Sequence, residues 1–421
     1  PAFLAEAERT THDFAFPESW QARSLRDCQG AAILLTAGID RWLASGDCAP
    51  AHAHRVRQAA NNARHAFEAF AETVRVHAAA PDDAASCGPE LYDLLLRRGH
   101  QCAQPRAELL VQARAQLRDA QRRLEATTRE QGPTWPDVQA RLASDHPEPD
   151  DYLAAFTRTW DACRATAIEH NVLTWPDWPL RYTTIPEFTR EAAPYLYYLY
   201  YRSPAPFDAY RVYDYVVPAL PEPNSETHLR TWNHSVIKLN HVVHHGSVGH
   251  HVQNWHAYHR ATSRVGKIAA VDCANRIGMF CGGTMAEGWA CYATQLMDEL
   301  GFLTPLEQVS EQHSRVRFLA RAIVDICFHE GSLSFNDAVA FFVAEARMEL
   351  GVARAEVTKC SMFPGTALMY WLGTQTILDL REERRRALGA SFELRKFHDE
   401  LLSYGSVPTP LVSRLMRLGS P

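Results

Sequence analysis

The stretch PRAELLVQARAQLRDAQRRLEATTRE, residues 105–130, carries the pattern that decides the fold. Its apolar residues recur at intervals of three and four, which places them on one face of an α-helix. Pro105 stands where a helix can start, because proline lacks only an N–H that the first turn leaves unpaired. The same spacing recurs at about 50–78, 151–170, 284–300, 304–328, 334–350, 366–388 and 391–403. The sequence therefore predicts a mainly α-helical protein.

Evidence for strands is thin. The segment YRVYDYVV, residues 210–217, alternates aromatic side chains as a short strand would. Segments such as TWPDWPLRYTTIPEF interleave aromatics with prolines, so we interpret them as loops and not as linkers. We expect a single domain over 1–421, in which a helical half, 1–200, forms the wall of a cleft and 201–421 is the catalytic half.

Composition limits the function classes. Of the 421 residues 46% are hydrophobic and 22% charged, and the net charge is −6, so no basic face for nucleic acid stands out. The ten cysteines are scattered without a CxxC pair, which is typical of buried thiols in a reducing compartment. No window reaches the roughly 18 apolar residues of a membrane helix, and the N-terminus lacks a secretory pattern. We expect a cytoplasmic protein without a membrane or nucleic-acid partner.

A second stretch is unusual in its histidines. The segment LNHVVHHGSVGHHVQNWHAYHR, residues 239–260, holds seven of the chain's 20 histidines. On a regular helix positions four apart share a face, so His241 and His245 form an HxxxH pair. The spacing alone leaves open whether this segment is a metal site or a set of buried, hydrogen-bonded imidazoles.

A different pairing needs an interrupted helix. His244 and His250 are six residues apart and would point about 120° away from each other, because each residue turns a helix by about 100°. Only a break would bring them together. Gly246 and Gly249 lie between these two histidines and permit such a break.

Two motifs resemble a known family. HHGSVGHHVQ (244–253) followed by EGWACYATQLMDELG (287–301) is similar to the signature of the bacterial domain of unknown function 885, a set of helical proteins related to gluzincin metallopeptidases. That signature reads H-E-x-x-P-G-H-H-x-Q and then E-G-W-A-x-Y. Further similarity lies in the expected order at 321–342, 364–381 and 392–408. The resemblance implies one helical body with a metal cleft, of the gluzincin and carboxypeptidase Taq kind, with few short strands.

The resemblance also implies a ligand set. His244, His250 and Glu287 would bind one divalent metal, with zinc expected first and iron as the alternative. Two imidazoles and a carboxylate leave coordination positions open for water and substrate. We expect Glu287 to open a helix and to point back toward the histidines. His251 is the rival of His250, since it lies two turns from His244 on an unbroken helix.

Four more residues are candidates for contact with substrate. His329 and Tyr370 resemble groups that donate hydrogen bonds to a substrate oxygen beside the metal. Arg381 could hold a carboxylate through its planar guanidinium, although its charge run, LREERRR, is also typical of a solvated face. Tyr215 belongs to a set of aromatics that could line the cleft or lie in the core, with Tyr210, Tyr213, Trp255 and Trp289.

The chain departs from the family pattern at two positions. His245 stands where the family has Glu, and Val248 where it has Pro. That Glu is the expected general base of a hydrolase, so its replacement bears directly on the reaction.

Three hypotheses follow. His245 serves as the base of a metal-dependent hydrolase that cleaves an amide, peptide or ester bond in a small molecule or short peptide. Alternatively, the metal serves a non-haem iron oxygenase, a lyase or a cyclase in small-molecule biosynthesis. In the third hypothesis the scaffold binds a ligand without catalysis. We expect a metalloenzyme, with hydrolysis slightly ahead.

Overall fold

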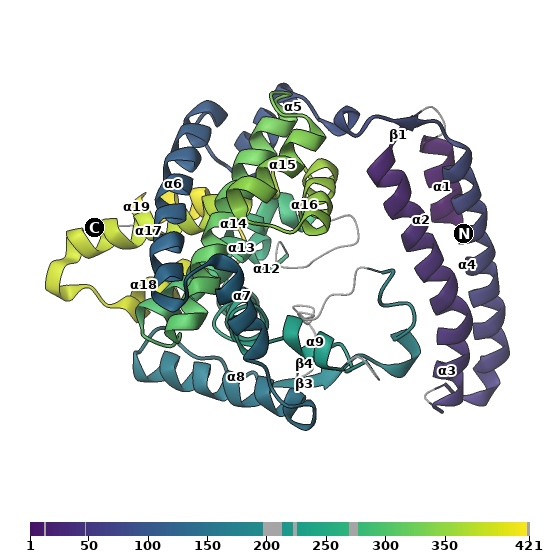
Figure 1. Cartoon of the computed structure of the whole chain (residues 1–421), viewed down its shortest axis with the longest axis horizontal. Coiled ribbons are helices and arrows are strands. Elements are labelled where there is room, and N and C mark those ends of the chain that lie inside the picture. Colours follow the sequence, from purple (N-terminus) through teal and green to yellow (C-terminus); the bar gives the residue numbers. More distant parts are fainter. Residues whose placement is uncertain (12–13, 47, 197–212, 222–224, 269–276, 419–421) are drawn as a thin grey trace. The chain divides into compact units, whose positions relative to one another are not determined.

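The computed structural model describes residues 1–421 except 12–13, 47, 197–212, 222–224, 269–276 and 419–421 (Figure 1). The protein is mainly α-helical, as the sequence predicts. It forms two compact units: unit 1 comprises 1–85, 183–200 and 216–219, and unit 2 comprises 86–182, 201–215 and 220–421. The first segment of unit 1 ends at residue 85. The predicted roles of 1–200 and 201–421 stay predictions. That the units act as a single domain stays a prediction.

Unit 1 is built on helices that run alongside one another (Figure 1). They are α1 (Ala2–Thr11), α2 (Glu18–Ile33), α3 (Ile39–Ala44) and α4 (Pro50–Val76), with a π-helical turn, η1 (Leu34–Gly38), between α2 and α3. Two short strands, β1 (Phe16–Pro17) and β2 (Ala79–Ala80), pair in parallel. Unit 1 also contains the 3₁₀ turns η2 (Asp82–Ala85) and η5 (Glu187–Thr189).

Unit 2 carries the histidine-rich stretch and the longest runs of buried residues. Up to that stretch its helices are α5 (Pro89–Leu94), η3 (Leu95–Gly99), α6 (Arg106–Gln131), α7 (Trp135–Ser144), η4 (Pro149–Asp151), α8 (Tyr152–Glu169), α9 (Ser225–Thr231) and α10 (His234–Val236). The stretch itself forms η6 (Ile237–Gly246) and α11 (His250–Arg260). The remaining helices are α12 (Arg264–Ile268), α13 (Ile277–Glu299), α14 (Pro305–His329), α15 (Phe335–Ala346), α16 (Leu350–Met362), α17 (Met369–Leu388), η7 (Gly389–Ser391), α18 (Leu394–Ser403) and α19 (Thr409–Leu418).

The strands are few and short, as expected. β3 (Leu180–Thr184) pairs with β4 (Tyr213–Val217). β4 confirms the described part of the strand predicted at 210–217, while 210–212 lie outside the described residues. β3 falls in a segment that we interpret from its sequence as a loop. The strand has only five residues and a proline on each side, so its pattern does not stand out in the sequence.

The expectation that Glu287 opens a helix is wrong. α13 begins at Ile277, so Glu287 lies in the interior of the helix. The helix continues through the glycines that precede Glu287. These glycines allow a neighbouring helix to pack closely, since a Cβ on Gly283 would lie 2.4 Å from the sulfur of Met369. What looked like a helix boundary is a contact between helices.

The packing of α13 against α17 fixes the position of Glu287. A Cβ on Gly288 would lie 2.4 Å from the Cα of Gly373, so the two backbones touch there. The hydroxyl of Thr374 donates a hydrogen bond to the carbonyl of Gly288 at 3.1 Å. Because only glycine permits this approach, the residue next to Glu287 is held by main-chain contact.

Candidate metal centre

The segment before the histidines is a π-helix and not an α-helix. η6 covers the ten residues Ile237–Gly246 and has the wide turn of a π-helix, in which the typical bond runs from an N–H to the carbonyl five residues back. The short helix α10, which leads directly into η6, is capped by Asn233, whose side chain accepts a hydrogen bond from the N–H of Val236 at 3.0 Å. The hydrogen-bond register of η6 therefore differs from the i→i+4 register of an α-helix.

The HxxxH pair does not come together as a metal site. The ring centres of His241 and His245 lie 6.5 Å apart. His241 is buried, stacks on Trp232 at 4.2 Å, and its Nδ1 lies 2.8 Å from the hydroxyl of Tyr215. His241 is therefore a packed core residue, and the regular-helix pair is not the site that the structure assembles.

The expected break is confirmed at Ser247–Gly249. Ser247 and Gly249 have ψ values of −118° and −121°, outside the helical range, and the N–H of Gly249 bonds to the carbonyl of Val243 at 2.9 Å. A Cβ on Gly249 would lie 1.8 Å from the carbonyl oxygen of His244, so no other residue fits without movement of the backbone. α11 then begins at His250.

The break brings three imidazoles together. One nitrogen from each of His244, His245 and His250 lies within 4.8 Å of the others, and this group could hold a metal ion. Their ring centres are 4.6 to 5.2 Å apart. The pairing of His244 with His250, which a straight helix forbids, is thus achieved by the π-helix and the break together.

Glu287 completes the group from α13. Its Oε2 lies 3.3 Å from Nε2 of His244 and 3.5 Å from Nε2 of His250. These separations exceed the usual N–H···O range. They match the roughly 3.4 Å between neighbouring ligand atoms in a tetrahedral site with metal–ligand bonds of about 2.0–2.1 Å.

The rival ligand His251 points elsewhere. Its Nε2 lies 2.8 Å from the carbonyl oxygen of Trp178, and the residue is fully buried. Burial lowers its pKa to about 4, so the ring is neutral and donates to that carbonyl. The structure therefore brings His250, and not His251, to the group.

His245 has a defined tautomer. Its Nδ1 lies 2.6 Å from the carbonyl oxygen of Asn240, so this nitrogen carries the proton and Nε2 keeps a free electron pair. Burial, with the neighbouring His244 and His250, holds the pKa of His245 well below its usual value. Burial also lowers the pKa of His244, which favours the neutral ring that a metal requires.

Glu287 is ready to act as an anionic ligand. Burial alone would raise its pKa, but His250 and His244 outweigh that effect and hold the pKa well below its usual value. About 21% of its side chain remains exposed, which leaves room for a further ligand.

Trp289 ties α13 to the break in the histidine stretch. Its indole N–H donates to the carbonyl of Val248 at 2.8 Å, and the side chain is fully buried. Trp289 is therefore a core residue that positions the site and does not line a cleft. Trp255 packs beside a separate cluster that contains Trp178 and Tyr258, and Tyr210 lies outside the described residues.

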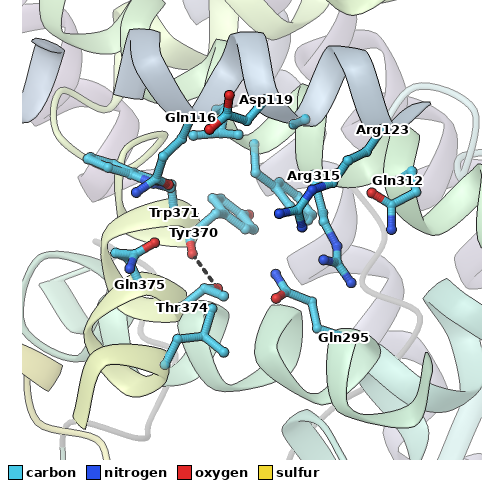
Figure 2. A pocket seen from close by; sticks show the side chains of 14 residues that line it. Gln116, Asp119, Arg123, Gln295, Gln312, Arg315, Tyr370, Trp371, Thr374 and Gln375 are labelled. Atoms are coloured by element: carbon cyan, nitrogen blue, oxygen red, sulfur yellow. Dashed lines mark hydrogen bonds between the residues drawn. The ribbon is translucent and has the colours of Figure 1, made fainter. Parts of the chain in front are cut away.

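Tyr370 lies near this group with a free hydroxyl. Its ring stacks on Phe318 at 5.3 Å, and no described residue lies at hydrogen-bond distance from its hydroxyl. Burial and the charge of Glu287 raise its pKa well above the usual value, so the hydroxyl keeps its proton and can donate it. Tyr370 also forms one wall of a cavity of about 240 Å³, whose other lining residues include Gln116, Gln295 and Gln375 (Figure 2).

His329 does not join the group. Its Nδ1 accepts from the N–H of Cys87 at 3.2 Å, and its Nε2 donates to the carbonyl of Cys360 at 3.1 Å. The ring also stacks on Tyr92 at 5.7 Å. Because the backbone takes both nitrogens, His329 has no donor left for the substrate oxygen that the sequence predicts it to contact.

The two predicted substrate-binding residues are similarly engaged. Arg381 donates to Glu299 at 2.6 Å and to the hydroxyl of Tyr292 at 2.9 Å. Tyr215 is fully buried, with its hydroxyl on His241. Both side chains bond to partners within the fold, so their contact with substrate finds no support here.

The chain belongs to the family of bacterial proteins of unknown function DUF885, whose model matches residues 8–416. None of the curated proteins matches the sequence significantly. No helix in the described part of the chain is long and apolar enough to cross a membrane.

Two solved structures share the fold. One, from Shewanella oneidensis, is 20% identical with a TM-score of 0.72, and the match covers 95% of this chain and 73% of that one. The other, from Colwellia psychrerythraea, is 19% identical with a TM-score of 0.65 and covers 86% and 60%. Each is described as a "putative lipoprotein", the first of unknown function. This chain thus spans less than two thirds of the second protein.

Proposed function

We propose that this member of DUF885 is a metal-dependent enzyme in which His244, His250 and Glu287 bind one divalent metal. Zinc is the metal that we expect first. The observation that carries the proposal is the position of Glu287 Oε2, 3.3 and 3.5 Å from the two Nε2 atoms. A hydrogen-bonded cluster would close these distances, whereas ligands of a shared ion keep them. When bound, the metal supplies Lewis acidity to the site.

The reaction that we propose is hydrolysis of an amide, peptide or ester bond in a small molecule or short peptide. His245 would take the proton of the attacking water at Nε2, because Nδ1 is held by the Asn240 carbonyl. Tyr370 would donate a hydrogen bond to the acyl oxygen as negative charge develops on it. His245 thus replaces the carboxylate base that the gluzincin pattern has at this position.

One observation favours a second candidate function. His245 belongs to the group of three imidazoles that lie within 4.8 Å of one another, so it could be a fourth ligand. Without a base, hydrolysis would be disfavoured, and a ligand set of imidazoles and a carboxylate also suits iron. The alternative is therefore a non-haem iron oxygenase, a lyase or a cyclase.

Metal content of purified variants tests both candidates. We expect about one metal per chain in the wild type, and a loss of binding in His244→Ala, His250→Ala and Glu287→Ala with helix content retained. His251→Ala is the matched control and should keep its metal. Elemental analysis of protein purified with and without oxygen distinguishes zinc from iron.

His245→Ala separates the two roles of that residue. If His245 is a base, the variant keeps the metal; if it is a ligand, affinity for the metal falls steeply. Full metal in Glu287→Ala, or none in the wild type after loading with zinc or iron, would contradict the proposed centre.

A further inference from the structure

Basic side chains gather beside Tyr370, on helices α14 and α16. Arg317 and Arg321 are one turn apart on α14, and Lys359 comes from α16. The Cζ of Arg321 lies 5.1 Å, and the Nζ of Lys359 lies 5.8 Å, from the centre of the Tyr370 ring. These positions are occupied by cations although the surroundings are largely buried.

One carboxylate offsets this charge only in part. Glu356 accepts from Arg321 through both of its oxygens, with Nε to Oε2 at 2.8 Å. Nη2 of Arg317 lies 3.9 Å from the same carboxylate, and Nε of Arg317 has no partner among the described residues. Two of the three positive charges are left without a matching negative charge in this group.

Lys359 is the cation with a free head group. No described residue lies within hydrogen-bond or ion-pair distance of its Nζ, which lies over the face of Tyr370. The Lys359 side chain is only partly exposed, so incomplete hydration of its ammonium group costs free energy. An anion bound at this position would relieve that cost.

The group borders the candidate metal centre. Tyr370 packs against Cys291, which lies one helical turn after Glu287 on α13. The carboxylate of Glu287 lies beside His244 and His250, so it does not pair with the Lys359 ammonium. The Lys359 ammonium at the face of Tyr370 therefore lies next to side chains that pack on the helix of Glu287.

We propose that Lys359 binds a carboxylate of the substrate while the reacting acyl group lies at the metal centre. This inference rests on the proposed function and adds the substrate class: acyl compounds with a second, ionised carboxyl group, such as N-acyl amino acids or the C-terminal ends of short peptides. A carboxylate fits better than a phosphate, because Lys359 is one compact charge and the guanidinium fork of Arg321 is occupied by Glu356.

Cobalt-loaded protein and simple chelators test this inference. The probes are the mono-hydroxamates of malonic, succinic and glutaric acids, each compared with its neutral methyl ester. The hydroxamate would bind the metal, and the free carboxylate would reach Lys359. We expect at least one acid to bind about tenfold or more tightly than its ester, measured from the visible spectrum of cobalt. In Lys359→Met this ratio should fall to about one.

Lys396→Met is the matched control, because Lys396 is exposed and paired with Glu393 on the surface. It removes the same charge and should keep the wild-type ratio. If Lys359→Met does not fold, Lys359→Gln replaces it in the same comparison of acids and esters. If both Lys359 variants lose cobalt, Lys359 holds the site together and the inference is overturned.

The remaining outcomes separate the two proposals. Equal binding of acids and esters to cobalt-loaded wild type, or a preference that survives in Lys359→Met, overturns the role of Lys359 and leaves the metal centre intact. If the wild type binds no cobalt, the proposed function fails and this inference fails with it.

Discussion

Two buried tyrosines on neighbouring helices differ in what their hydroxyl groups contact. The Tyr370 hydroxyl has no partner among the described residues. The Tyr292 hydroxyl accepts from Arg381 at 2.9 Å and donates to Nε2 of His398 at 2.8 Å. A hydroxyl that bonds to nothing in the fold costs nothing to remove, unless a ligand uses it.

We therefore expect Tyr370→Phe to leave the free energy of unfolding within about 0.5 kcal/mol of the wild type. Its turnover of acyl esters or anilides should fall on the order of a hundredfold, because one donor to the developing charge is lost. Tyr292→Phe should lose about 1 to 3 kcal/mol of stability, since Arg381 and His398 are left with unpaired groups. Urea unfolding and a rate assay check both; a large stability loss in Tyr370→Phe would make its hydroxyl structural.

At the scale of elements, the π-helix and the break after it assemble the site. Gly249→Ala would place a methyl group 1.8 Å from the His244 carbonyl oxygen, so the backbone must move. We expect a loss of about 2 kcal/mol or more, together with weaker metal binding.

Gly351→Ala is the matched control for that substitution. It lies in the first turn of α16, where the added Cβ would meet only the Glu349 carboxylate at 4.0 Å. The variant should be neutral or up to about 1 kcal/mol more stable, because alanine favours helix. If Gly249→Ala matched it in metal affinity and stability, the break would not control the site.

The sequence predicts much of these elements because apolar spacing reports the buried face of a regular helix. α4, α6, α8, α14, α17 and α18 lie close to their predicted limits. The break at Gly249 could also be predicted, since only an interrupted helix lets His244 meet His250. The π-helical register could not, because the spacing argument assumes 3.6 residues per turn.

Lys359 shows why other parts of the site were missed. Its helix, α16, was not predicted, and its apolar residues do not recur regularly. Glu356 and Lys359 also have the spacing of an ordinary exposed ion pair, so nothing in the sequence indicates that the lysine faces Tyr370 instead. The side chains around it come from α14 and α17, and such a contact arises only from tertiary packing.

At the scale of the molecule, many histidines are buried in the neutral form. Burial lowers the pKa of His398 to about 3 and the pKa values of five others to about 4; these are His100, His251, His256, His313 and His329. An unfolded histidine binds its proton near pH 6.5. Between about pH 6.5 and 4 the unfolded chain therefore binds more protons, and stability falls as the pH falls.

We expect urea unfolding to show a steep loss of stability between pH 6.5 and 4.5. Each of these histidines contributes a slope of up to about 1.4 kcal/mol per pH unit. Asp325 opposes them, because burial raises its pKa to about 7 and its contribution is lost as the pH rises. His251→Asn should reduce the slope of unfolding free energy against pH by the contribution of one histidine. Equal stability at pH 7.5 and pH 5 would contradict this account.

The ten-residue π-helix has a consequence for insertions and deletions. Its wide turns accommodate the chain between the cap at Asn233 and the break at Ser247. If one residue were deleted before His244, the segment could return to α-helical hydrogen bonding, and each later side chain would turn by about 100° around the axis. All three imidazoles would still be encoded, yet they would no longer meet Glu287. In relatives the length of this segment should therefore vary less than the identity of its solvent-facing residues.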